Sequence, residues 1–139
     1  MTVDVLVDTG PLVAILDRSY SHHTACVEAL SLLRTPLVTT WPVLTEAAYL
    51  LRQRSDLVGR LMRSTSEGFL RIAVLREIDA IAMAEIMERY VDQHFQLADV
   101  SLMLLVDRDR IETVFTLDRR DFSVFRTRQG SHLRLIPEL

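Results

Sequence analysis

Short apolar runs alternate with segments of helical periodicity along the chain, and this alternation limits the possible folds more than any other feature of the sequence. The runs have the length and composition of buried strands, and the segments between them repeat apolar residues at i, i+3, i+4 and i+7. Strands that alternate with helices predict an α/β domain with a largely parallel sheet. We expect a single domain over residues 1–139, because that length is near the commonest size of one domain.

The predicted elements follow from these two periods. Strands are expected over 3–7, 36–40, 69–75, 113–117 and 133–136. Helices are expected to open at Gly10-Pro11, to cover 22–33, to include 44–51, and to cover 56–67, 77–93 and 97–106. The last of these helices is apolar on nearly all sides, which predicts that it is buried.

The composition excludes several classes of protein. The chain is 49% hydrophobic and 25% charged, as globular domains are, and its apolar runs are shorter than the ~20 residues of a membrane span. Cys26 is the single cysteine, and the segment that begins at Met1 lacks the basic stretch of a secretory signal, so we expect a cytoplasmic protein. The net charge is -3 and lysine is absent, which excludes any reaction that needs a lysine side chain.

Four acidic residues fall where a parallel sheet forms its sites, outside the carboxyl ends of the strands. Asp8 follows the first strand, Asp118 follows the fourth, Glu46 lies early in the helix after the second strand, and Asp99 lies near the start of the apolar helix. Each alone has an ordinary explanation as a turn, cap, first-turn or solvated helix residue. Together they would repel one another unless a cation neutralised them, and such hard oxygen ligands suit Mg²⁺ or Mn²⁺.

Weaker candidates surround Asp118. Thr116 precedes it by two residues, so both side chains are expected on the same side of the chain, although Thr is also simply common in strands. Asp121 follows it by three residues and is either an auxiliary ligand or an ion-pair partner of Arg119 or Arg120. Those two arginines are candidate contacts for substrate phosphates.

Four segments of the chain form a set of motifs that occur in order and span nearly its whole length. They are Val5-Leu-Val-Asp-Thr-Gly-Pro-Leu-Val-Ala14, Val43-Leu-Thr-Glu-Ala-Ala-Tyr-Leu-Leu51, Leu97-Ala-Asp-Val-Ser-Leu102 and Thr116-Leu-Asp-Arg-Arg-Asp-Phe122. This set resembles the PIN domain, and specifically the short VapC-type toxin ribonucleases of prokaryotic toxin–antitoxin pairs. The fourth segment is the most specific. Trp41 departs from the family pattern, which more often has a small polar residue before the second acid.

The resemblance implies a three-layer α/β/α sandwich with a central, mainly parallel sheet, and an endoribonuclease that cleaves RNA with water activated by Mg²⁺ or Mn²⁺. The metal-binding and catalytic acids would be Asp8, Glu46, Asp99 and Asp118. Thr116 and Asp121 would support them. The implied partners are RNA and a cognate antitoxin, whose C-terminal segment covers the site, often with an Arg among the acids. The chain is also expected to form a homodimer and to need no membrane.

Other interpretations of the same residues are weaker. Asp8-Thr-Gly10 also occurs in aspartic proteases, but that fold is all-β and Pro11 here opens a helix. Receiver and haloacid-dehalogenase-like domains need a lysine near the phosphate. His22 and His23 fit a polar surface loop better than a metal site. The main alternative is a PIN-like module that binds RNA or an antitoxin with little turnover, and Asp8→Asn distinguishes it from an enzyme.

Overall fold

The computed structural model describes residues 3–138 and contains one five-stranded sheet in the order β3-β2-β1-β4-β5, with every neighbouring pair of strands parallel. The strands are β1 (Leu6–Val7), β2 (Leu37–Thr39), β3 (Leu70–Ile72), β4 (Thr113–Phe115) and β5 (Arg134–Ile136). The first strand of the chain is therefore the middle strand of the sheet, between β2 and β4. The predicted α/β class with a parallel sheet is confirmed.

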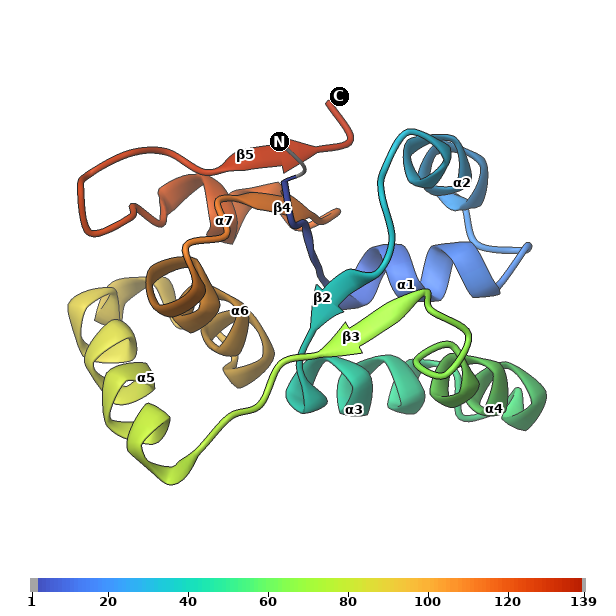
Figure 1. Cartoon of the computed structure of the whole chain (residues 1–139), viewed down its shortest axis with the longest axis horizontal. Coiled ribbons are helices and arrows are strands. Elements are labelled where there is room, and N and C mark those ends of the chain that lie inside the picture. The colour runs from blue at the N-terminus through green and yellow to red at the C-terminus, as the bar shows by residue number, and fades with distance from the viewer. Residues whose placement is uncertain (1–2, 139) are drawn as a thin grey trace.

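Seven α-helices within residues 3–138 connect the strands. They are α1 (Thr9–Leu16), α2 (His23–Ser31), α3 (Trp41–Leu50), α4 (Ser55–Arg63), α5 (Glu77–Arg89), α6 (Leu97–Asp109) and α7 (Arg119–Val124). A 3₁₀ turn, η1 (Val91–Gln93), precedes α6. Figure 1 shows α5 and α6 on one side of the sheet and α1, α2 and α4 on the other, as expected for a three-layer α/β/α sandwich. Helix α3 begins directly after β2 and contacts both α1 and α6.

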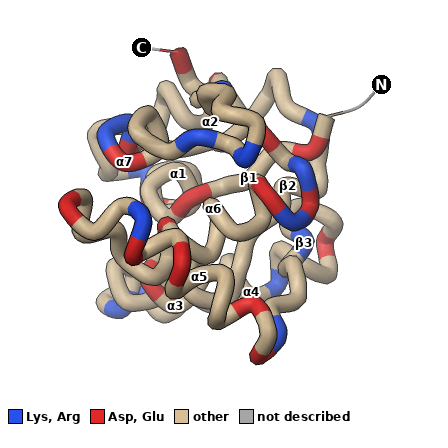
Figure 2. Tube along the Cα trace, turned by 90° about the vertical axis from the view of Figure 1, so that its left-hand side faces the viewer, with Lys and Arg blue, Asp and Glu red and all other residues tan. Residues whose placement is uncertain are grey.

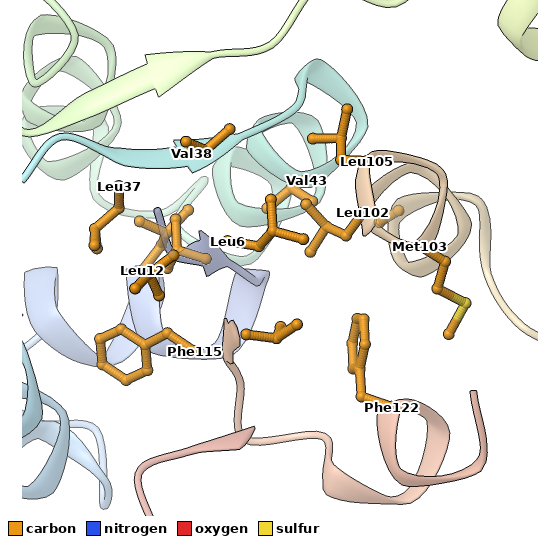
Figure 3. Packing of buried hydrophobic residues seen from close by; sticks show 14 of the residues in the cluster. Leu6, Leu12, Leu37, Val38, Val43, Leu102, Met103, Leu105, Phe115 and Phe122 are labelled. Atoms are coloured by element: carbon orange, nitrogen blue, oxygen red, sulfur yellow. The ribbon is translucent and has the colours of Figure 1, made fainter. Parts of the chain in front are cut away.

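The apolar core fills the space between the sheet and its helices (Figure 3). Leu6 of β1 lies in it with Leu12 of α1 and Leu102 of α6, and all three side chains are essentially inaccessible to solvent. Helix α6 is buried from Ala98 to Val106, as its continuous apolar sequence predicts. This burial brings Asp99, in the first turn of α6, into the interior near the carboxyl edge of the sheet.

The predicted and observed elements differ mainly at their ends. The helix expected over 77–93 ends at Arg89, and the chain then passes through η1 to His94, whose φ of 55° is left-handed. The strand expected over 69–75 pairs with β2 only over Leu70–Ile72. Helix α7 was not predicted, because its six residues are too few to show a helical period.

Figure 2 shows arginines interspersed with acidic residues on the side of the molecule that it displays, in keeping with the small net charge. Across residues 3–138, no helix combines the length and apolar character that crossing a membrane requires. Met1 and Thr2, which belong to the segment compared with a secretory signal, lie outside the described residues, as does Leu139.

Candidate active site

An open cleft of about 780 Å³ lies at the carboxyl ends of the central strands. Five carboxylates line it, from Asp8, Glu46, Asp99, Asp118 and Asp121. They come from the end of β1, from α3, from the first turn of α6 and from the start of α7. Asp8 and Asp99 are buried, whereas Asp118 is exposed. The fold therefore gathers all four predicted ligands, and the auxiliary candidate Asp121, around one cavity.

Thr116 joins the two strand-end aspartates through its hydroxyl group. The hydroxyl donates to Asp8 Oδ2 at 2.8 Å and accepts from the Asp118 N–H at 2.9 Å. The strands β1 and β4 set this arrangement, because the Asp8 N–H donates to the Phe115 carbonyl oxygen at 2.9 Å and so aligns the two strand ends. The Asp8 side chain makes no capping bond to α1, although Asp8 is the N-cap residue of that helix. Instead, Asp8 lines the cleft, and the Thr116 hydroxyl holds its carboxylate.

Replacing Thr116 by Val is expected to lower activity by about 10- to 100-fold, the usual cost of removing a group that orients a ligand. Val has nearly the shape of Thr but neither donates to Asp8 nor accepts from Asp118. Thr116→Ser keeps the hydroxyl and is the matched control, with activity expected near that of the wild type. The readout is the rate of the RNA cleavage that the resemblance implies, over a range of Mg²⁺ concentrations. A loss in Thr116→Ser with none in Thr116→Val would mean that the methyl group, not the hydroxyl, matters.

A close backbone approach explains the glycine in the opening motif. A Cβ added at Gly10 would lie 3.3 Å from the Leu117 Cβ, which is tighter than an ordinary contact. Gly10 therefore lets the start of α1 pack against the segment that leads from β4 to Asp118. Here the motif Asp8-Thr-Gly10 belongs to a strand-to-helix junction, as its helix-opening Pro11 predicted, and not to a protease loop.

Asp99, Asp118 and Asp121 make the tightest acidic cluster of the described residues, with one carboxylate oxygen from each lying within 4.8 Å of the others. Asp118 also caps α7, since its carboxylate accepts from the Asp121 N–H at 3.4 Å. Asp118 is therefore both a helix cap, the ordinary role of an Asp at such a position, and a member of the acidic cluster. The same helical turn directs Asp121 towards Asp99. Spacing alone leaves Asp121 as either an auxiliary ligand or an ion-pair partner of a neighbouring arginine. Among the described residues it forms no ion pair.

Two buried hydroxyls tie the helix of Asp99 to the helix of Glu46. Thr40, the N-cap of α3, and Ser101 of α6 are 2.7 Å apart between their hydroxyl oxygens. Ser101 donates its one hydroxyl proton to the Ala98 carbonyl oxygen, so Thr40 is the donor and Ser101 the acceptor in this pair. This link fixes the starts of α3 and α6 against each other at the cleft.

Burial and mutual repulsion raise the pKa of three of the acids. Burial is the main cause that raises the pKa of Asp8 to about 6. The nearby Thr9 N–H and the hydrogen bond from the Thr116 hydroxyl oppose it, and the charges of Glu46 and Asp118 add to it. Burial, and then the charges of the neighbouring aspartates, raise the pKa of Asp99 well above its ordinary value. The pKa of Asp121 is raised in the same direction, again chiefly by burial. A cation in the cleft would relieve this repulsion.

The donor set fits a hard divalent cation. Carboxylate oxygens are the ligands that Mg²⁺ and Mn²⁺ prefer, and three of them converge here from Asp99, Asp118 and Asp121. Thr9 also lines the cleft, and its hydroxyl is the one buried side-chain polar atom of the described residues without a hydrogen-bond partner. A buried hydroxyl of this kind usually has a partner, so it marks a place where a ligand or its water can bind.

The rest of the lining carries side chains that no motif in the sequence marks as site residues. Tyr20 and His22 come from the loop between α1 and α2, and His94 from the turn before α6. Arg120 also lines the cleft, whereas the Arg119 guanidinium donates to the Pro137 carbonyl oxygen at 2.8 Å. Of the two arginines predicted to contact substrate, Arg120 is thus the one at the cleft. No periodic signal marks loop residues such as Tyr20, which is why sequence reasoning missed it.

An α/β/α domain whose acids gather at the carboxyl edge of a parallel sheet has the architecture expected of a PIN-like domain. No family model matches the chain. Its sequence is 31% identical over 135 residues to ribonuclease VapC26 of Mycobacterium tuberculosis, a match that covers 96% of this chain and 100% of that protein. The chain therefore belongs to the VapC ribonuclease family.

A solved structure supports the fold independently. The crystal structure of Mycobacterium tuberculosis VapC20, described as a toxin that cleaves the sarcin-ricin loop, matches with a TM-score of 0.77 and 14% sequence identity. The match covers 84% of this chain and 92% of that chain. At this identity the likeness concerns the fold alone, which is the predicted PIN-like α/β/α sandwich.

Proposed function

We propose that this protein is a metal-dependent endoribonuclease and the toxin of a toxin–antitoxin pair. The observation that carries the proposal is the convergence of Asp99, Asp118 and Asp121 within one cleft that Asp8 and Glu46 also line. Membership of the VapC ribonuclease family supports RNA as the substrate. The oxygen-only donor set supports Mg²⁺ or Mn²⁺ as the cofactor.

The residues of the cleft have distinct roles in this proposal. Asp99, Asp118 and Asp121 would hold the cation, which supplies an activated water molecule and offsets the charge on the leaving oxygen. Asp8 and Glu46, the other two predicted ligands, would add their carboxylates to the site, and Thr116 keeps Asp8 oriented. Water would add to phosphorus, the bond from phosphorus to one bridging oxygen would break, and a proton from the water would end on the freed oxygen as a hydroxyl group, which leaves the RNA as two ends.

Arg120 is the side chain best placed to contact RNA beside the acids. It is exposed at the cleft, where its guanidinium can bind a phosphate that flanks the cleaved bond. The acidic net charge is compatible with RNA binding, because the local potential at the cleft and not the overall charge governs the approach of a phosphate.

Removal of the metal tests this function directly. Purified protein is expected to cut a pool of structured RNA in Mg²⁺ or Mn²⁺, to stop in EDTA, and to resume when the metal is restored. Asp8→Asn run alongside is expected to be inactive, and mapping the cut ends identifies the RNA. Cutting that persists in EDTA would contradict the metal dependence. RNA bound equally by both proteins and never cut would favour a binding module over an enzyme.

An apolar groove beside the acidic cleft supports an antitoxin as partner. The groove, of about 580 Å³, lies between α3 and the start of α6 and is lined by Pro42, Tyr49, Leu97 and Ala98. It shares Glu46 and Gln96 with the cleft. Tyr49 and Leu97 are more than half exposed, as contact residues of a docking groove are. A peptide with an apolar side chain in the groove and an Arg in the cleft would match both surfaces.

Tyr49→Ala is expected to weaken binding of the paired antitoxin by about tenfold, because it removes an exposed aromatic anchor from the groove. Leu32→Ala is the control, since Leu32 is the most exposed of the large apolar residues and lines neither cavity. The measurement is the dissociation constant by isothermal titration. Unchanged affinity in Tyr49→Ala would exclude the groove as the docking site. Homodimer formation stays a prediction.

A further inference from the structure

Two exposed aromatic rings line the acidic cleft. They belong neither to the proposed metal ligands nor to the groove proposed to bind the antitoxin. Tyr20 and His22 both line the cleft, and their ring centroids are 6.2 Å apart with the planes tilted by 40°. Tyr20 keeps 37% of its surface accessible, and His22 is exposed. Neither ring forms a hydrogen bond with another of the described residues. Such rings are available to a ligand in the cleft.

The backbone that carries these rings is held in place by local hydrogen bonds. Asp17 accepts from both the N–H and the hydroxyl of Ser19, at 3.0 and 2.6 Å. The Tyr20 N–H donates to the Asp17 carbonyl oxygen at 3.1 Å, and the His23 ring contacts the Ala14 carbonyl oxygen at 2.6 Å. The loop is thus anchored at both ends, and the rings need little ordering when a ligand binds.

The chemistry of the lining divides the cleft into two kinds of surface. The carboxylates of Asp8, Asp99, Asp118 and Asp121 suit a cation and, through it, a phosphate. Tyr20 and His22 offer ring faces, which stack well on nucleic-acid bases. A nucleotide has both parts, a phosphate and a flat base, joined at a fixed short distance.

We propose that Tyr20 and His22 form a stacking surface for an unpaired base of the RNA substrate, beside the phosphate that is cleaved. This inference rests on the proposed ribonuclease function and adds the residues that position the substrate. Stacking does not distinguish one base from another, so the two rings select an accessible base and not a sequence. A base inside a duplex has its faces covered by its neighbours and would not fit this surface.

Variants that remove the ring of Tyr20 or His22, compared with a variant that keeps the ring, test the proposal. Tyr20→Ala and His22→Ala are each expected to lower kcat/KM for the RNA that the protein cuts by roughly 5- to 100-fold, the range found when a stacking side chain is removed. Tyr20→Phe keeps the ring and is expected to stay within about twofold of the wild type. His132→Ala, an exposed histidine outside the cleft, is the matched control for His22→Ala. Thermal unfolding of each variant separates misfolding from lost contact.

A second experiment locates the stacked base. Copies of the RNA, each with one abasic ribonucleotide, are cut by the wild type and by Tyr20→Ala. At one position next to the cut, removing the base from the RNA is expected to slow the wild-type protein by as much as the Tyr20→Ala substitution slows cleavage of the intact RNA. The same abasic RNA is expected to be cut by Tyr20→Ala no more slowly than the intact RNA is. Additive losses at every position, or equal rates for Tyr20→Ala and the wild type, would overturn the inference and leave the ribonuclease function standing. A wild type that neither binds nor cuts RNA would overturn both.

Discussion

Replacing Asp99 by Asn is expected to lower the rate of RNA cleavage by more than about 100-fold, beyond the loss usual for groups that only orient a ligand. Asp99 contributes one of the three oxygens that converge within 4.8 Å, and it does so from a buried position in the first turn of α6. An amide has the same shape but no charge, so it holds a divalent cation far more weakly. The cleft would keep its form and lose its metal.

A residue at the other end of the same helix provides the control for Asp99→Asn. Asp109 is the last residue of α6 and pairs with Arg108 at 2.8 Å, outside the cleft. Asp109→Asn is expected to cleave RNA within about threefold of the wild type, as substitutions away from the reacting groups do. The comparison uses single-turnover cleavage with saturating Mg²⁺. If Asp99→Asn cut as fast as Asp109→Asn, the acidic cluster would not be the catalytic centre.

The second large effect is on stability, and it has the opposite sign. In metal-free protein, Asp8→Asn is expected to be more stable than the wild type at pH 7 by about 3 kcal/mol, or on the order of 10 °C in Tm. The pKa of Asp8 is about 6 in the folded protein against 3.8 as the reference for the unfolded chain. Between those values the folded state holds a proton that the unfolded state has released, so rising pH removes stability. The Asn side chain of the variant does not ionise, so the variant does not lose this stability as the pH rises.

Differential unfolding in EDTA between pH 4 and pH 7.5 measures this effect. The Tm of Asp8→Asn minus that of the wild type is expected to grow as the pH rises through this window, and to shrink when Mg²⁺ is added, because the cation stabilises the charged acids of the wild type. Asp4→Asn is the control, since Asp4 is exposed and pairs only loosely with Arg71 at 3.7 Å. A difference in Tm that did not change with pH would contradict the conclusion that burial raises the pKa of Asp8 in the folded protein.

Much of the architecture could be predicted from local patterns. The apolar run before Asp8 and the continuous apolar segment of α6 predicted a buried strand and a buried helix, because hydrophobic period and length depend on neighbours in the sequence alone. Helix α7 was missed since six residues show no period, and with it the turn that directs Asp121 to Asp99. The acidic residue types indicated a cation site. Which three acids lie closest together depends on the turn of α7, because that turn brings Asp121 near Asp99 and Asp118.

The sequence by itself indicated the class of fold, an acidic site for a cation and the likeness to VapC ribonucleases, because each is carried by patterns within short segments of the chain. Only the tertiary structure decided which groups meet. Thr116 bonds to Asp8 across 108 positions, and Tyr20 reaches the cleft from a loop without any periodic pattern. Such meetings depend on the order of strands in the sheet, which long-range pairing and burial select and which no local pattern encodes.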